Sequence, residues 1–88
     1  MIKTFRKYGE MGVLHKDGTA MTLNFKLIPS IDEIGITLED ASVNAPFSFW
    51  LETKASLGTK LLLIKEEFDW LANGEALRIV KALEEWVS

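Results

Sequence analysis

Three segments of the chain alternate apolar and polar residues, which is the pattern of half-buried β-strands. They are residues 21–27, 34–38 and 47–51. Successive side chains of a strand point to opposite faces, so one face of the predicted sheet is apolar and Trp50 falls on the other. The inward-facing side chains are Met21, Leu23, Phe25, Leu27, Ile34, Ile36, Leu38, Phe47, Phe49 and Leu51.

A hairpin is predicted where the first of these segments begins. Residues 2–16 favour extended structure, and the dipeptide Asp17-Gly18 that follows is typical of a two-residue type I′ turn. Such a turn fixes which residues of the two strands face each other. The expected pairs are Lys16 with Thr19, Leu14 with Met21, and Gly12 with Leu23.

The last third of the chain has a different pattern. Residues 61–64 form an unbroken apolar run, which favours a central strand with both faces covered. From residue 65 onward the apolar residues recur at helical spacing and predict one amphipathic helix over residues 65–87. Asn73-Gly74 interrupts this helix, because an interior glycine costs about 1 kcal/mol relative to alanine. The alternative is a break at 73–74, with a short helix over residues 65–72 and a second helix over residues 75–87 that Asn73 caps.

These elements predict an α+β fold in a single domain of 88 residues. We expect a curved, mostly antiparallel sheet of four to six strands over residues 2–64, arranged as a meander because the connections are short. One C-terminal amphipathic helix is expected to pack across one face. Since a single helix covers only one face, the second face is expected to be covered either by curvature of the sheet or by a second copy of the chain, and a homo-oligomer, with a dimer favoured, is expected.

The composition indicates the cellular compartment in which the protein is expected. The chain has no cysteine, which excludes disulfides and thiol nucleophiles. Its basic N-terminus is not followed by the apolar core of a signal peptide, and no apolar run approaches the roughly 18 residues that a membrane span needs. We therefore expect a cytoplasmic protein without a membrane span.

The charge is unevenly distributed within a formal net charge of −3. Residues 1–30 carry +3, from five basic and two acidic residues, and residues 31–88 carry −6, from five basic and eleven acidic residues. Basic side chains interleaved with aromatics on a sheet can hold phosphates while bases stack. The candidate contacts to single-stranded nucleic acid are Lys3, Arg6, Lys7, Tyr8, Lys16, Lys26 and Trp50.

Catalytic and metal chemistry have little support in the sequence. His15, the only histidine, lies near the predicted hairpin tip on the outward face, which is typical of a solvated surface residue. The acidic pairs Asp32-Glu33 and Glu39-Asp40 bracket a strand and could hold a hard cation, but adjacent acidic residues at strand ends are typical of plain loops. There is no phosphate-binding or dinucleotide-binding glycine motif. We expect no enzyme and no catalytic, cofactor-binding or metal-binding residues; a small enzyme or metal-binding protein is the remote alternative.

The segment from Thr59 to Leu71 resembles the last strand and helix start of the positive-cofactor-four and Whirly-like single-stranded DNA-binding proteins. In that family a strand of alternating apolar residues runs into a helix that opens with an acidic pair, an aromatic and a leucine. The resemblance implies a strongly curved antiparallel sheet, one helix that dimerises, and single-stranded DNA as ligand. Lys60 stands where the family usually has a glycine, and the family's basic strand pattern is only partly present. The matching residues are Leu61, Leu63, Glu66, Phe68 and Leu71.

A protein-interaction module is the competing class. Trp70 and Leu77 lie seven residues apart, on the side of the predicted helix opposite its apolar stripe, and an exposed pair of this kind marks a contact surface. Trp50 on the outward sheet face is the third interface candidate. We therefore expect a small self-associating binding domain that acts through protein–protein contacts, with single-stranded DNA or RNA as the alternative ligand.

Overall fold

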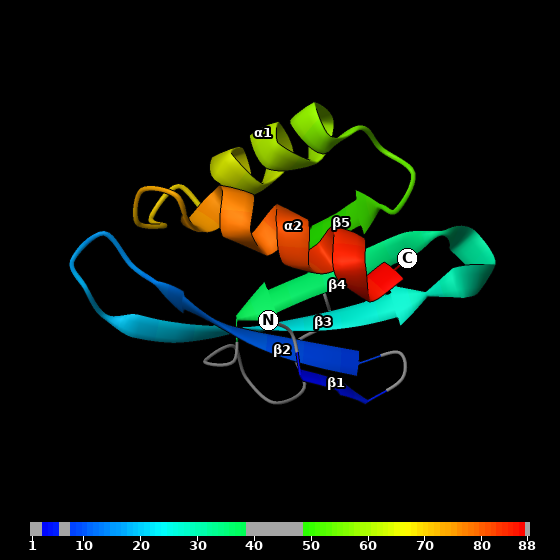
Figure 1. Cartoon of the computed structure of the whole chain (residues 1–88), viewed down its shortest axis with the longest axis horizontal. Coiled ribbons are helices and arrows are strands. Elements are labelled where there is room, and N and C mark those ends of the chain that lie inside the picture. Colours follow the sequence, from blue (N-terminus) through cyan, green and yellow to red (C-terminus); the bar gives the residue numbers. More distant parts are fainter. Residues whose placement is uncertain (1–2, 6–7, 39–48, 88) are drawn as a thin grey trace.

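The computed structural model describes residues 3–5, 8–38 and 49–87. Five strands form one antiparallel sheet in chain order, and two helices lie on one of its faces (Figure 1). The fold is therefore α+β with a meandering antiparallel sheet, as the alternation predicts. The elements are β1 (Lys3–Phe5), β2 (Tyr8–Leu14), β3 (Ala20–Ile28), the 3-10 turn η1 (Pro29–Ile31), β4 (Glu33–Leu38), β5 (Phe49–Glu52), α1 (Leu57–Glu67) and α2 (Glu75–Val87).

The alternation correctly predicts which side chains of β3, β4 and β5 face the helices. The fully buried ones are Leu23, Phe25, Ile34, Ile36 and Leu51. Met21, Leu27, Leu38 and Phe49 are partly buried and pack against this core. Residues paired across antiparallel strands share a face, so Phe25 opposite Ile36 and Ile34 opposite Leu51 extend one apolar layer across three strands. Phe47 lies outside the described residues.

The hairpin forms at the predicted dipeptide, but its register differs by one residue. Backbone hydrogen bonds join Gly18 N to His15 O and His15 N to Thr19 O, both at 2.9 Å, so the loop has three residues instead of two. Gly18 has φ 91°, which fits the left-handed position that ends a type I turn with a bulge. The predicted pairs are therefore wrong: Leu14 faces Ala20, Val13 faces Met21, Gly12 faces Thr22 and Met11 faces Leu23.

This shift decides which residues of β2 enter the core. Met11 and Val13 each keep only 2% of their surface exposed, whereas Gly12 and Leu14 are on the solvent side. A one-residue change of register exchanges the two faces of a strand, so the loop length alone determines this outcome.

The prediction of a central strand over residues 61–64 is wrong, because this segment lies in α1. Ser56 caps the helix by accepting a hydrogen bond from the backbone N–H of Thr59 at 3.2 Å. A short apolar run is compatible with either a strand or a helix, and the cap selects the helix. Of α1, only Lys60 and Ile64 are buried, and the leucines at 62 and 63 face solvent.

The single helix predicted over residues 65–87 is also wrong. The alternative is confirmed for its second helix, over residues 75–87, but its first helix, over residues 65–72, is wrong because the chain leaves the helix at Phe68, before Asn73-Gly74. α1 ends at Phe68, whose N–H donates to Ile64 O at 2.9 Å, and α2 begins at Glu75. Gly74 has φ 88°, a left-handed conformation that glycine adopts without the steric penalty of a Cβ atom. The sheet is therefore covered by a pair of helices rather than by one.

Helix α2 is amphipathic, as its spacing predicts, and contacts β2, whereas α1 contacts β5. Its ring contact with the sheet is between Trp86 and Phe25, whose centroids lie 6.2 Å apart. The buried residues of α2 are Ala76, Ile79, Val80 and Leu83. No helix in residues 3–5, 8–38 and 49–87 is long and apolar enough to cross a membrane.

Candidate functional site

The face of the sheet turned away from the helices carries one row of aligned residues, which we call the cross-strand row. Strand pairing places Tyr8 opposite Lys26, Lys26 opposite Gly35, and Gly35 opposite Trp50. Neighbouring strands lie about 4.8 Å apart, so Tyr8 and Trp50 are separated by about 14 Å along the row. Both helices lie on the opposite side of the sheet (Figure 1). The row therefore lies on the outer face, which neither helix covers.

The row combines two aromatic side chains and one cation. Tyr8 and Trp50 keep 55% and 38% of their surface exposed. The Lys26 ammonium lies 5.8 Å from the centre of the Tyr8 ring, within the range of a cation–π interaction. Gly35 adds no side chain, so Lys26 and Trp50 have no side chain of β4 between them in the row. An aromatic side chain with part of its surface exposed therefore stands at each end of the row.

The outer face also carries acidic groups. Glu10 lies in β2, two residues from Tyr8, and Glu33 lies in β4 directly opposite Glu52 of β5. Like charges placed directly opposite each other on a sheet repel. Together with Lys26, and with Lys3 opposite Glu10 in the strand register, these three carboxylates give the described part of this face both signs of charge and an acidic excess.

Of the seven nucleic-acid candidates, Tyr8, Lys26 and Trp50 come together in the cross-strand row. Lys3 lies in β1, opposite Glu10 in the strand register. Lys16 lies in the hairpin loop and lines a cavity on the helical side of the sheet. Arg6 and Lys7 lie outside the described residues. The predicted basic strand surface is therefore divided between two sides of the molecule.

The interface candidates Trp70 and Leu77 do not share a helix face, because the chain turns between α1 and α2. Trp70 stacks on His15 with ring centroids 5.6 Å apart and an interplanar angle of 9°, and its edge meets Phe68 at 5.9 Å. His15, predicted to be a solvated residue, is therefore packed against an aromatic ring. Leu77 lies exposed on α2. Trp70 belongs to the packing between hairpin and helices, and the two residues line different cavities: Trp70 a smaller one beside Phe49, and Leu77 a larger one between the helices.

The hairpin loop is fastened to the connection between the helices. The backbone N–H of Lys16 donates to Trp70 O at 2.9 Å, and that of Ala72 donates to Leu14 O at 2.8 Å. His15 and Leu71 form a bridge between the two segments. These bonds fix the loop, and with it Lys16, at the end of the helix pair.

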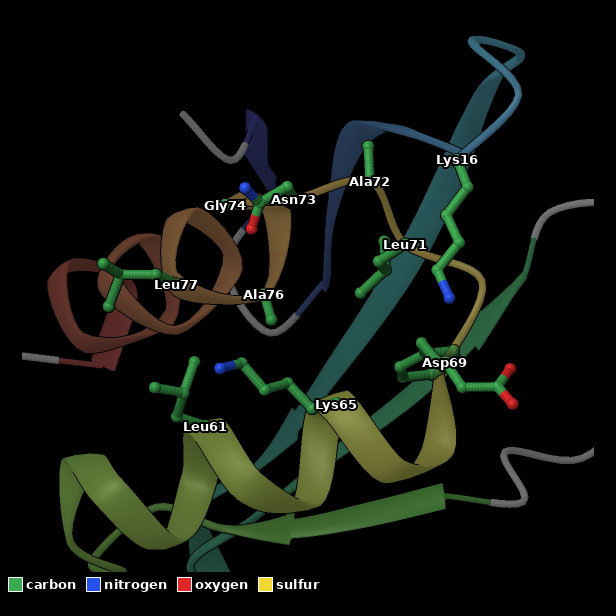
Figure 2. A pocket seen from close by; sticks show the side chains of 11 residues that line it. Lys16, Leu61, Lys65, Asp69, Leu71, Ala72, Asn73, Gly74, Ala76 and Leu77 are labelled. Carbon is green, nitrogen blue, oxygen red and sulfur yellow. The ribbon is translucent and has the colours of Figure 1, made fainter.

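An interhelical cavity of about 570 Å³ opens between α1, α2 and the hairpin loop (Figure 2). Leu61 of α1 and Leu77 of α2 line its two helical sides, and the largely buried Phe68, Leu71 and Ala76 form its apolar base. Two cations, Lys16 and Lys65, come to it from different elements. The sequence pattern does not predict this cavity, because the apolar run at residues 61–64 favours a strand. The signal for the helix is Ser56 ahead of that run.

No group of three histidine, cysteine or acidic side chains in the described residues is placed to hold a metal ion. Of the two acidic pairs named as possible cation ligands, the structure describes Asp32-Glu33: Asp32 Oδ2 lies 3.4 Å from Lys54 Nζ, and Asp32 O accepts from Thr53 N at 2.8 Å. Its partner pair at residues 39 and 40 lies outside the described residues.

Among the residues that the structure describes, Glu75 and Asp17 have a carboxyl pKa below the ordinary value. Hydrogen bonds from Arg78 are the main cause for Glu75, against an opposing effect of burial. Hydrogen bonds from Thr19 are the main cause for Asp17. Both of these carboxyl groups hold the hairpin in place. Asp17 Oδ1 accepts a hydrogen bond from Thr19 N at 2.8 Å within the loop, and Glu75 Oε2 accepts one from Leu14 N.

No protein-family model, curated protein or solved structure matches this chain. The similarity of residues 59–71 to the positive-cofactor-four and Whirly-like proteins stays a prediction. In the structure these residues form most of α1 and the turn that follows.

Proposed function

We propose that the chain is a non-enzymatic binding domain that self-associates through the outer face of its sheet, with a second copy of the chain as its partner. The observation that supports this proposal is the cross-strand row, in which Tyr8 and Trp50 stay exposed on the face that neither helix covers. Aromatic side chains dominate the buried centres of protein interfaces because they give large contact areas with few rotatable bonds.

The charges of the outer face favour a protein partner over a polyanion. In a two-fold interface each patch meets its own copy, so Lys26 of one copy can face carboxylates of the other. The available carboxylates are Glu10, Glu33 and Glu52. A nucleic-acid backbone would meet the same three carboxylates as repulsive charges.

Sedimentation equilibrium over a wide concentration range tests self-association. The expected result is a mass that rises toward the dimer as concentration increases. The double variant Tyr8→Ser with Trp50→Ser is expected to stay monomeric. Leu62→Ser is the matched control, because Leu62 is an equally apolar, 57% exposed residue on α1, away from the outer face. A wild-type protein that stays monomeric, or a control that loses association as the double variant does, would remove the proposal.

Single-stranded DNA or RNA is the second candidate ligand, favoured by the order of side chains in the row. An aromatic, a cation and a second aromatic follow one another across about 14 Å, a spacing over which bases can stack while a lysine holds a phosphate. Fluorescence anisotropy of a labelled single-stranded oligonucleotide, titrated at low and moderate salt, tests this function. Lys26→Ala should weaken binding and reduce its salt dependence, whereas Lys81→Ala on the exposed side of α2 should not. An absence of binding at low salt would eliminate this candidate.

A further inference from the structure

The interhelical cavity is on the opposite side of the sheet from the outer face and has the character of a small-ligand site. Its volume of about 570 Å³ lies in the range of about 300–1,000 Å³ found for small-molecule pockets. Most of its lining is apolar, with Leu61 and Leu77 on the helical sides and buried side chains at its base. Binding pockets of this size usually combine such a lining with a few polar groups that orient the ligand.

The polar groups of this cavity carry mainly positive charge. Lys16 reaches it from the hairpin loop and Lys65 from α1. In Figure 2 the Lys65 side chain extends between the helices toward Leu61 and Leu77, whereas the Lys16 side chain extends toward Asp69 at the other end of the cavity. In the described part of the chain, neither ammonium group takes part in an ion pair. Asp69 is the one acidic side chain of the lining, and its carboxylate points away from Leu61 and Leu77 (Figure 2).

The placement of the two lysines is fixed by different parts of the fold. Lys16 N donates to Trp70 O, which fastens the backbone of the loop to the connection between the helices. Lys65 lies one helical turn after Leu61, on the same side of α1. Cations on two sides of an apolar space are therefore a consequence of how hairpin and helices meet, in a chain whose net charge is negative.

We infer that the interhelical cavity binds a small anionic amphiphile, a molecule with an apolar body and one carboxylate. The apolar body replaces water against Leu61, Leu77 and the cavity base, which provides most of the binding free energy. The carboxylate lies at the Lys65 ammonium and accepts a charge-assisted hydrogen bond from it, and Lys16 adds a second positive charge at the other end of the cavity. A neutral amphiphile gains only the first contribution, and a cationic one is repelled by both lysines.

Titrations of the full chain with decanoate, decanol and decyltrimethylammonium test the ligand class, with the two ionic probes below their micelle-forming concentrations and decanol below its solubility limit. These probes share one alkyl chain and differ in the charge of their head group. We expect saturable binding of decanoate, followed by heteronuclear NMR shifts of residues that line the cavity. Decanol is expected to bind about tenfold more weakly, because it lacks the charge-assisted hydrogen bond. Decanol or decyltrimethylammonium binding as tightly as decanoate would overturn the inference.

Variants at the cavity test its location. Lys16→Glu with Lys65→Glu is expected to weaken decanoate binding at least about tenfold while leaving decanol binding unchanged. Leu77→Ser should weaken both probes, and Leu62→Ser is its matched control because Leu62 is exposed on α1 without lining the cavity. Lys81→Glu is the control for net charge. Decanoate binding that survives the double lysine variant, or that falls equally with Lys81→Glu, would place the ligand elsewhere.

The result does not depend on self-association. The variant Tyr8→Ser with Trp50→Ser changes only the outer face and is expected to bind decanoate as the wild type does. A monomeric wild-type protein that still binds decanoate would remove the proposed function alone. A dimer that binds none of the three probes would remove this inference alone.

Discussion

Glu75 and Arg78, one turn apart on α2, both form hydrogen bonds with backbone groups at the open edge of β2. Arg78 Nη2 donates to Gly12 O at 2.6 Å, and Glu75 Oε2 accepts from Leu14 N at 2.9 Å. The two side chains also pair with each other, with Nη2 to Oε2 at 2.7 Å and Nε to Oε1 at 3.0 Å. Because β1 pairs only with residues 8–10 of β2, this ion pair takes the place of a neighbouring strand beyond that point.

Removing this pair is expected to destabilise the fold. Arg78→Ala takes away the donor to Gly12 O and leaves the Glu75 carboxylate, which is only 12% exposed, without its cation. We expect a loss of about 1–2 kcal/mol in the free energy of unfolding, because Arg78 itself is partly exposed and solvent screens the pair. Urea denaturation measures it. Lys81→Ala, an exposed basic residue of the same helix, is the control, and an equal effect of both variants would contradict a role for the edge contact.

The same pair makes stability depend on acid pH. Hydrogen bonds from Arg78 hold the pKa of Glu75 below its ordinary value in the folded state. The stabilisation is therefore complete above the unfolded pKa, near about 4.3, and is lost as the pH falls through the lower folded pKa. We expect Glu75→Gln to be less stable than the wild type at pH 7 and to approach it in strongly acidic solution.

Thermal unfolding between neutral and acidic pH measures this difference. The variant Asp17→Asn is measured alongside, because hydrogen bonds from Thr19 also lower the pKa of Asp17. The stability that Asp17 contributes is therefore also lost as the pH falls. If the difference in stability between the wild type and Glu75→Gln stays constant down to the lowest pH, the Glu75–Arg78 pair is not the source of the acid dependence.

Lys60 is the one charged residue in the buried set of the described chain, with 1% of its surface exposed. Its ammonium donates to Thr53 O and to Glu84 Oε1, both at 2.7 Å. Glu84→Ala leaves a buried cation with one acceptor and is expected to cost about 1–3 kcal/mol, whereas Lys60→Met removes the charge itself and is expected to cost less. Urea denaturation of the two single variants shows which one costs more stability. The control is Glu66→Ala, because Glu66 is an exposed residue of α1. Lys60→Met proving the more damaging change would contradict the prediction.

Two glycines offer a matched test of backbone conformation. At both Gly18 and Gly58 an added Cβ atom would have no neighbour within 4 Å, so packing does not distinguish them. Gly18 has φ 91°, where an L side chain is strained, and Gly18→Ala should cost about 1 kcal/mol. Gly58 lies in the first turn of α1, where Gly58→Ala should stabilise by up to about 1 kcal/mol. Thermal melting of both variants is the measurement, and shifts of the same sign would contradict this explanation.

The sheet is predicted well from the sequence because the signal for it, the alternation of apolar and polar residues, lies within each strand. Alternation in the residues around Phe25, Ile36 and Leu51 requires one buried face whatever the rest of the chain does. Alternation could not determine the loop length at Gly18, because a glycine in left-handed conformation suits both a two-residue and a three-residue loop. The faces of β2 depended on that single choice.

The helical layer was harder to predict, because its sequence signals conflict. The apolar run at residues 61–64 fits a strand on composition, while the N-cap at Ser56 fits a helix. The positions of the interface candidates depend on these elements. Trp50 was correctly expected on the outer face, while Trp70 and Leu77 lost their common surface when the chain turned at Gly74.

The contact of His15 with Trp70, and the backbone bonds beside it, also affect the order of events during folding. The hairpin is synthesised early, yet the residues that fasten its loop come more than fifty positions later in the chain. Contacts this distant in sequence carry a large loop-closure entropy and form late. On the ribosome, the nascent sheet would therefore emerge with its apolar face bare. Until α2 is released, that bare face is a substrate for chaperones and a risk for aggregation.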